Sequence, residues 1–148
     1  MPQAPQHTLT AAQPLPGQRL ALTFADGYAA TVDLSDWSRR KPLRALADAA
    51  VFTAARVDAR GGYVVFVPDD AELAADNLRN LAVEQAGGIG HERLWNWMAR
   101  NGLTRARAAT GIGISRRVLN YYLYGAKPIP LTVWLACLSW EAQQAPAA

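Results

Sequence analysis

Cysteine and histidine are scarce in this chain of 148 residues, which has one cysteine, Cys137, and two histidines, His7 and His91. A single cysteine excludes an internal disulfide, and so few nitrogen and sulfur ligands exclude a structural zinc site. The longest apolar run, LTVWLACLSW, falls short of the roughly 18 residues that cross a bilayer, and the N-terminus lacks a signal-peptide pattern. We therefore expect a cytoplasmic protein without membrane contact, with Cys137 in a core.

The chain also lacks the constellations that support catalysis. His7 lies in a segment rich in Pro, Gln and Ala, and His91 opens a predicted helix, so neither has an evident catalytic partner. Carboxylates cluster once, at Asp69, Asp70, Glu72 and Asp76. Such oxygen ligands suit Mg²⁺, but acids at a turn that leads into a helix N-terminus are also ordinary. We expect no enzyme, no cofactor and no metal site.

Acidic residues are absent between Arg100 and Lys127, a stretch with six basic residues counting both ends. Residues 1–88 carry eight Lys and Arg against ten Asp and Glu, a net charge of −2, whereas residues 89–148 carry seven against two, a net charge of +5. A solvated helical face usually mixes the two signs. The basic stretch therefore favours a polyanionic partner.

Residues 18–86 show strand patterns. Leu20, Leu22 and Phe24 alternate with smaller or more polar residues, and Asp26-Gly27 then supplies a tight two-residue turn, which predicts a hairpin. A second hairpin is predicted about Gly61-Gly62 in AARVDARGGYVVFVP. Residues 1–17 are predicted to be a tail that contributes at most one short edge strand, about residues 8–12.

Helical patterns complete this half. One short helix is predicted at residues 43–49, after Pro42, and another at residues 76–85, with Leu78, Leu81 and Ala82 on one face. Hairpins with added helices indicate a small α+β domain built on an antiparallel sheet.

After a Gly-rich linker at 87–90, residues 91–142 predict an all-α bundle of four helices. The first has Leu94, Trp97 and Met98 on one face. The last opens at Pro130, runs to about residue 141, and is predicted to turn one apolar stripe inward, formed by Leu131, Trp134, Leu135 and Leu138. Residues 143–148 are predicted to be a disordered tail.

The two middle helices flank a pair of glycines. Thr104 is predicted to cap a helix that ends at Gly111, and Ser115 a helix of residues 116–124 that ends at Gly125, with Gly113 in the turn between them. A phosphate-binding loop is the alternative, but it requires a preceding strand and a third glycine or a Gly-Lys-Ser/Thr sequence. TRARAAT precedes Gly111, and neither requirement is met.

The helix of residues 116–124 has two different faces. Val118, Leu119, Tyr122 and Leu123 fall on one arc of the helical wheel, and the other arc presents Arg116, Arg117, Asn120, Tyr121 and Tyr124. Arginine pairs with guanine O6 and N7, asparagine pairs with adenine, and tyrosine hydroxyls suit phosphates or base edges. An ordinary amphipathic surface helix is the alternative, although Glu and Lys are more typical of one.

The segment LTRARAATGIGISRRVLNYYLYGAKPIP resembles the helix-turn-helix of the Cro and phage-repressor family. The residues in register with the family pattern are Leu103, Thr104, Ala109, Ile112, Gly113, Ile114, Ser115, Leu119, Tyr122, Gly125 and Pro130. Arg105 departs from the usual Gln, Arg107 stands where an acid is common, and Met98 and Leu123 occupy places that often hold an Arg–Glu pair. Apolar groups on both sides of a lost ion pair preserve a core.

The resemblance implies that residues 115–124 enter the major groove of double-stranded DNA. Base contacts are then expected from Arg116, Arg117, Asn120 and Tyr121. Phosphate contacts are expected from Thr104, Arg105, Arg107, Ser115, Tyr124 and Lys127. The implied protein is a sequence-specific transcriptional regulator of a prokaryote that acts as a homodimer, with the first domain or the last helix supplying the contact.

The first domain resembles a small family of uncharacterised prokaryotic domains. The resemblance rests on LTFADGYAATVDL, which matches an apolar-x-Phe-x-Asp-Gly hairpin, and on FTAARVDARGGYVVFVPDDAELAADNL, which departs from the family's Trp-Pro-Asn-Gly at Val67–Asp70. Some members of that family accompany toxin-like partners. An alternative function is therefore a protein-interaction module, an antitoxin or adaptor whose N-terminal domain binds a protein partner.

Overall fold

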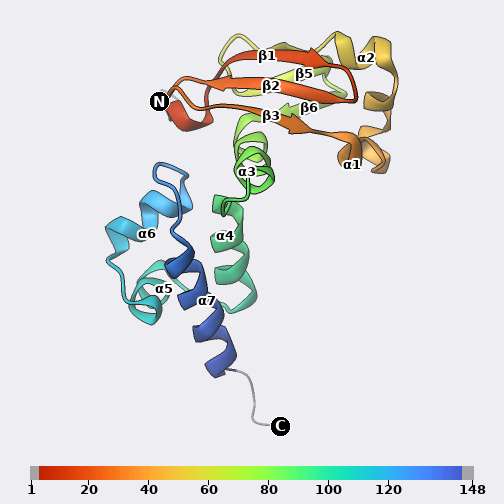
Figure 1. Cartoon of the computed structure of the whole chain (residues 1–148). Coiled ribbons are helices and arrows are strands. Elements are labelled where there is room, and N and C mark those ends of the chain that lie inside the picture. The colour runs from red at the N-terminus through yellow and green to blue at the C-terminus, as the bar shows by residue number, and fades with distance from the viewer. Residues whose placement is uncertain (1–3, 145–148) are drawn as a thin grey trace. The chain divides into compact units, whose positions relative to one another are not determined.

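The structure is a computed structural model that describes residues 4–144 (Figure 1). The chain forms two compact units, Met1–Gln85 and Ala86–Ala148. Within the described residues the first unit contains all the strands and the second is helical, which confirms the predicted α+β class. Residues 86–90, where the second unit begins, form neither helix nor strand. Among residues 4–144, no helix has the length and apolar character that crossing a membrane requires.

The first sheet is antiparallel, with the strand order β1-β2-β3. Its strands are β1 (Leu9–Leu15), β2 (Arg19–Phe24) and β3 (Ala29–Asp33). The first predicted hairpin is confirmed, because Leu20 pairs with Val32 and both side chains are fully buried. The turn is longer than expected: Phe24 N donates to Tyr28 O, so the loop has three residues and ends at Gly27, whose φ is 92°. This left-handed φ accounts for the glycine.

The segment predicted as a tail belongs to this unit. Its described part begins with a 3-10 turn, η1 (Pro5–His7), and β1 then pairs with β2 over its full length. Leu9 is only 3% exposed, and its N–H donates to Gly61 O at 2.7 Å. Gly61 has a φ of 75°, and a Cβ there would lie 2.5 Å from Leu9 O. The edge strand predicted at about residues 8–12 is therefore confirmed as β1, which extends further, to Leu15, and the prediction of a tail was wrong for the rest of residues 5–15. Residues 1–3 lie outside the described range.

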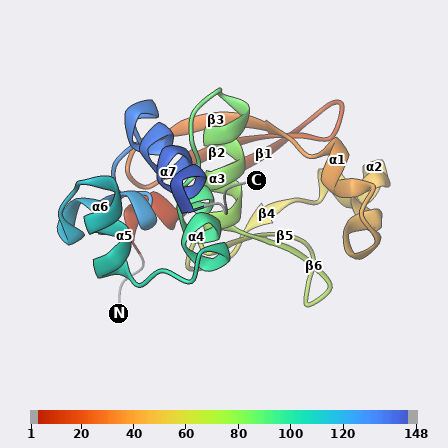
Figure 2. The same ribbon diagram turned by 90° about the horizontal axis from the view of Figure 1, so that it is seen from below.

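The second sheet is also antiparallel, with the strand order β4-β5-β6 (Figure 2). Its strands are β4 (Arg56–Val57), β5 (Tyr63–Val67) and β6 (Ala71–Ala74). Pairing of Val57 with Val64 confirms the predicted second hairpin. The strand β6 was not predicted, because its four residues contain no β-branched or aromatic side chain. A tight turn precedes it, in which Asp69 takes a φ of 59°.

Four helical pieces accompany the sheets. They are α1 (Ser35–Ser38), η2 (Lys41–Ala47), α2 (Ala49–Thr53) and α3 (Ala75–Gln85). The predicted helix at 43–49 is instead a 3-10 helix that stops at Asp48, whose carboxylate accepts from Ala50 N at 2.9 Å and so caps α2. The predicted helix at 76–85 is confirmed as α3, which buries Leu78 and Ala82.

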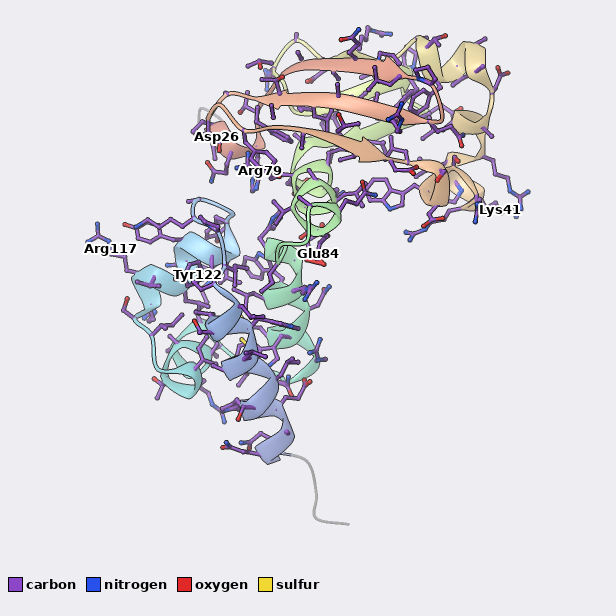
Figure 3. All side chains as sticks on the ribbon, viewed as in Figure 1. Asp26, Lys41, Arg79, Glu84, Arg117 and Tyr122 are labelled. Atoms are coloured by element: carbon purple, nitrogen blue, oxygen red, sulfur yellow. The ribbon has the colours of Figure 1, made fainter. Side chains whose placement is uncertain are left out.

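One core joins both sheets and α3. At its edge the guanidinium of Arg79, on α3, lies 4.0 Å from the ring centroid of Tyr28 and 5.0 Å from that of Phe24. It donates to both carboxylate oxygens of Asp26, at 3.0 and 2.9 Å. Figure 3 shows the two residues side by side. These hydrogen bonds hold the pKa of Asp26 below its ordinary value. Arg79 therefore fastens α3 to the hairpin loop.

The second unit contains α4 (His91–Arg100), α5 (Arg105–Ile112), α6 (Arg116–Leu123) and α7 (Leu131–Gln144). The predicted inner face of α4 is confirmed, with Leu94, Trp97 and Met98 buried. Cys137 is also buried, as expected, and burial raises the pKa of its thiol to about 12. Leu119 and Leu123 of α6 complete this core together with Ala108 and Ala109 of α5.

The predicted inner stripe of α7 was mostly wrong. On the inner side of α7, Cys137 is buried, and Trp134 and Trp140 pack against the core of the second unit. The three leucines lie on the other side of the helix, with exposed fractions of 63% for Leu131, 51% for Leu135 and 41% for Leu138. The helix also continues through Gln144, so the predicted tail at 143–148 does not begin at 143; residues 145–148 lie outside the described range.

Candidate nucleic-acid interface

The start of α5 is capped as predicted. Thr104 has extended backbone angles, and its Oγ1 accepts from Arg107 N at 3.2 Å. Capping satisfies one of the N–H groups that the first helical turn leaves without a partner. The remaining N–H groups give this helix end a partial positive charge.

The turn between α5 and α6 corrects the prediction for Gly111. The helix α5 continues through Gly111 and ends at Ile112, and Gly113 caps it in the left-handed conformation with φ 77° and ψ 31°. Ile114 N then donates to Ala109 O at 3.0 Å and closes the turn. Gly111 has a different role: a Cβ there would lie 2.8 Å from Nε1 of Trp140, so the missing side chain lets the indole approach α5.

The helix α6 begins where the sequence predicted. Ser115 caps it, since Oγ accepts from Val118 N at 3.1 Å. Leu119 and Leu123 face the core, whereas Arg116 and Arg117 are exposed. The predicted division of this helix into an apolar and a polar face is therefore confirmed. We call the side that carries Arg116, Arg117, Asn120 and Tyr121 the outer face of α6.

Arg117 is ordered by a neighbouring ring. Its Nε donates to the hydroxyl of Tyr121 at 2.8 Å, and Lys127 Nζ lies 4.4 Å from the centroid of the same ring. Figure 3 shows Arg117 pointing away from the ribbon. Because this hydrogen bond uses Nε, the two terminal amino groups of Arg117 keep the fork that pairs with guanine or phosphate. Arg117, Tyr121 and Lys127 form one cationic cluster, which we call the Tyr121 cluster.

Arg105 is held inside a second cluster. Its guanidinium lies 5.4 Å from the Trp95 ring centroid and 5.3 Å from the Tyr124 ring centroid. It donates to the Tyr124 hydroxyl at 2.5 Å and to Asn120 Oδ1 at 3.4 Å. Trp95 is anchored in turn, because its Nε1 donates to Leu123 O at 2.8 Å. These contacts join three elements, α4, α5 and the end of α6, and we call this set the Arg105 cluster.

Arg116 and Arg107, unlike Arg117 and Arg105, belong to neither cluster. Among the described residues, neither guanidinium has a hydrogen bond, ion pair or ring contact with another side chain, and both are exposed. The second unit has two acids, Glu92 and Glu141. Arg100 binds Glu141 at 2.6 and 3.1 Å and keeps the pKa of that carboxyl below its ordinary value. The charge of Arg116 and Arg107 is therefore not neutralised by any acid on α5 or α6.

The structure thus brings the predicted residues together in two groups and leaves two arginines outside them. Thr104 and Ser115 use their side-chain oxygens as helix caps, and their hydroxyl hydrogens stay available to an acceptor. Sequence reasoning missed Trp95, whose aromatic ring orders Arg105. Its position beside the buried pair Leu94 and Trp97 gave no signal for this role, because a second tryptophan on the same helix is ordinarily assigned to a core.

No group of three or more His, Cys, Asp or Glu side chains that could hold a metal ion occurs within residues 4–144. The carboxylates near residue 70 serve the turn and the helix start. Glu72 accepts from Asp69 N at 3.2 Å, and Asp76 accepts from Asn77 N at 2.8 Å.

Comparison with solved structures gives a match over nearly the whole chain. The crystal structure of the "putative DNA binding protein NE0471" from Nitrosomonas europaea is 38% identical in sequence and superposes with a TM-score of 0.85. The match covers 95% of this chain and 90% of that chain. No family model and no curated protein matches the sequence.

Proposed function

The chain belongs to the family of the Nitrosomonas europaea protein, and from that premise we propose that it is a sequence-specific DNA-binding protein. In this proposal it is a prokaryotic transcriptional regulator without enzymatic activity, and α5 and α6 form a helix-turn-helix of the Cro and phage-repressor type. The helix α6 enters the major groove of double-stranded DNA.

The outer face of α6 is the observation that carries the proposal. Directly after the Ser115 cap it presents Arg116, whose guanidinium has no partner among the described residues, and Arg117, whose terminal amino groups extend from the Tyr121 cluster. In a helix-turn-helix the first residues of the second helix contact base edges. Two arginine forks at this position suit guanine O6 and N7, each worth about 1–3 kcal/mol of discrimination.

Phosphate contacts would supply most of the affinity. Arg107 is open to solvent at the capped start of α5, and Lys127 lies beside the ring of Tyr121. Thr104, Ser115, Tyr124 and Arg105 add hydroxyl and guanidinium donors on the same helices. If about four to six phosphates are neutralised, the binding constant falls with salt with a logarithmic slope of roughly −4 to −5.

The alternative function, a protein-interaction module, predicts large apolar side chains on the outer face of α6. Arg116 and Arg117 occupy that face, and the buried side of the helix holds its leucines. This arrangement supports DNA over a protein partner at α6. A protein partner for the first unit remains compatible with DNA binding by the second.

Selection of bound duplexes from a random DNA pool tests the proposal. We expect a short enriched motif with the intact chain and its loss with Arg116→Ala/Arg117→Ala. The matched control is Arg39→Ala/Arg40→Ala, which removes the same charge from an exposed loop of the first unit and should return the same motif. An unenriched pool at low salt contradicts the proposal; a motif that persists in the α6 variant contradicts only the choice of base contacts.

We also propose that two copies associate through α7. Leu131, Leu135 and Leu138 are spaced i, i+4 and i+7, so they form one apolar stripe that stays exposed on the described part of the second unit. A stripe of this kind suits a two-fold contact with a second copy, in which the same residues meet from both sides. A symmetric pair would place two α6 helices on half-sites about 34 Å apart.

Sedimentation velocity tests this contact. Leu135→Glu should convert a dimer to a monomer, since it places a charge in the centre of the stripe. Thr132→Glu is the control, because Thr132 is exposed on the same helix but lies outside the stripe. A monomeric parent chain, or a Leu135→Glu chain that still sediments as a dimer, contradicts the α7 contact.

A further inference from the structure

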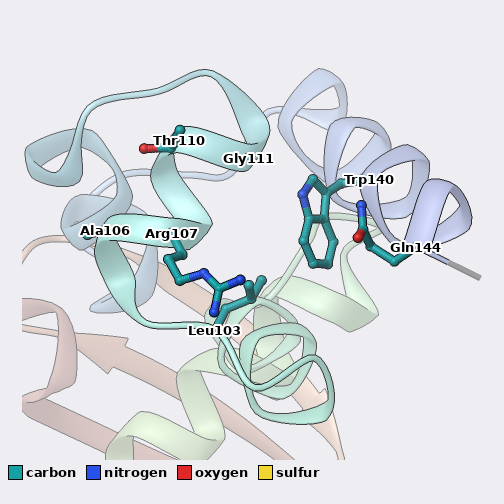
Figure 4. Close-up of a pocket in the computed structure, with 7 residues that line it drawn as sticks. All are labelled: Leu103, Ala106, Arg107, Thr110, Gly111, Trp140 and Gln144. Atoms are coloured by element: carbon teal, nitrogen blue, oxygen red, sulfur yellow. The ribbon is translucent and has the colours of Figure 1, made fainter.

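A groove of about 460 Å³ lies between α5 and α7, within the second unit (Figure 4). Its size is within the range of small-molecule sites, about 300–1,000 Å³. Leu103 and Ala106 line it with apolar groups, Trp140 supplies an indole, and Arg107 and Gln144 supply polar ends. Figure 4 shows the Trp140 ring standing between the two helices, with the Arg107 side chain reaching toward Leu103.

The aromatic wall of the groove is held in place. The Trp140 ring meets Trp97 edge to face, with centroids 5.6 Å apart at an interplanar angle of 81°. On its other side, Gly111 leaves no room for a methyl group next to Nε1. A flat apolar surface that is fixed before binding favours a flat ligand, because little side-chain entropy is lost.

The polar end of the groove selects for an anion. The guanidinium of Arg107 has no hydrogen bond or ion pair with another residue in the described part of the chain. None of the described residues that line the groove is acidic, and Glu141, which follows Trp140, is engaged by Arg100 and by Asn101 Nδ2 at 2.6 Å. A planar guanidinium pairs best with a planar carboxylate, through two parallel hydrogen bonds. The side-chain amide of Gln144 adds a neutral donor and acceptor.

We propose that this groove binds a small aromatic carboxylate, and that the bound ligand weakens DNA binding. The second part rests on the proposed function, in which Arg107 contacts phosphate at the start of α5. A carboxylate in the groove takes up two of the guanidinium's donors and neutralises its charge, which weakens its pairing with a DNA phosphate. The two anions therefore compete for Arg107, and by linkage DNA must weaken the ligand as much as the ligand weakens DNA.

Salicylate is a suitable probe, and salicylamide is its neutral counterpart with the same ring. The indole N–H resonances of the five tryptophans report binding in ¹⁵N-labelled full-length chain without DNA, and Trp140→Phe identifies the resonance of Trp140. We expect salicylate to shift that resonance in a saturable manner and salicylamide to bind at least about tenfold more weakly, because it cannot form a charge-assisted pair.

Arg107→Gln is the decisive variant, and Arg60→Gln is its control, with the same change of charge at an exposed residue outside the groove. Arg107→Gln should weaken salicylate about tenfold and Arg60→Gln should not. Saturating salicylate should weaken binding of the selected duplex by the intact chain and leave the lower affinity of Arg107→Gln unchanged.

The groove assignment is overturned by any of three results: unperturbed indole resonances, equal binding of salicylamide, or equal salicylate binding by Arg107→Gln. Unchanged DNA affinity at saturation overturns the competition.

The two proposals fail separately. A chain that selects a DNA motif but does not bind salicylate refutes the groove and leaves the proposed function intact. A chain that binds salicylate through Arg107 but selects no motif refutes the proposed function and the competition, and leaves the groove assignment intact.

Discussion

Replacing Arg105 with lysine separates two roles that this residue can have. If Arg105 is only a phosphate contact, Lys keeps the charge and most of the DNA affinity. The geometry argues for more, because the Arg105 guanidinium lies against Trp95 and Tyr124 and donates to Asn120. A lysine ammonium lacks the planar fork that makes two directed hydrogen bonds at once.

The size of the effect follows from the interactions that a lysine side chain cannot make. Two cation–π interactions at a half-buried site contribute about 0.5–1 kcal/mol each, and hydrogen bonds from a charged donor contribute about 1.5–3 kcal/mol. Lysine keeps part of the cation–π stabilisation and one of the hydrogen bonds. Arg105→Lys should therefore lower the free energy of unfolding by about 1–2 kcal/mol, and Arg105→Ala by about 2–4 kcal/mol. In a unit of this size 1 kcal/mol lowers Tm by roughly 4–8 °C.

Intrinsic fluorescence measures the stability, since four of the five tryptophans, all but Trp37, belong to the second unit. For DNA, Arg105→Lys should keep the salt slope but relax the preference at the base pair that we propose Asn120 contacts, because the Asn120 amide is no longer oriented. A variant with unchanged Tm and an unchanged selected motif would refute the positioning role and return Arg105 to a simple phosphate contact.

Three further predictions concern the packing that supports the site and the first unit. Gly111→Ala should lower Tm because its methyl group meets the Trp140 indole, and adding Trp140→Phe should restore most of the loss; equal losses in the single and double variants would contradict this contact. Arg79→Met should lower the free energy of unfolding by about 2–3 kcal/mol and should weaken the loss of stability at acid pH. The folded-state pKa of Asp26 is below its ordinary 3.8, so the stability that Asp26 contributes is present at neutral pH and is lost as pH falls through and below that value. A variant that loses stability with acid as steeply as the parent chain would show that another group causes the loss. Leu123→Glu places an acid in a fully buried position and should unfold the second unit at lower temperature by thermal denaturation, whereas an unchanged Tm would show that this site is not core.

Much of the fold could be predicted because the local patterns were strong. Leu20 and Leu22 carry the period of a strand, and Gly27 and Gly61 mark the two hairpins at positions of positive φ. The caps Thr104 and Ser115 likewise marked the starts of α5 and α6. Local chemistry determines each of these features, so no knowledge of distant contacts was needed.

Three of the errors depend on distant contacts. The segment that forms β1 looks like a tail because it is rich in Pro and Gln, and only its pairing with β2 makes it a strand. Gly111 looks like a helix stop, yet α5 continues through it because the glycine accommodates Trp140, far along the chain. The sequence predicted which side chains lie on the outer face of α6. It could not predict that Arg105 stacks on Trp95, because that contact depends on how α4 packs against α5.

The helix α7 shows why periodicity alone could not assign its inner side. Apolar residues occur almost all round this helix, so the sequence pattern has no single phase. The phase is set instead by Trp140, whose ring is placed between Trp97 and the bare backbone of Gly111. Once that ring faces inward, helical geometry places Leu131, Leu135 and Leu138 on the outer side of the helix. Exposed there, they lower the solubility of the protein unless another surface packs against them. The same geometry that made the predicted stripe wrong therefore creates the exposed apolar surface for which we propose a second copy of the chain as the partner.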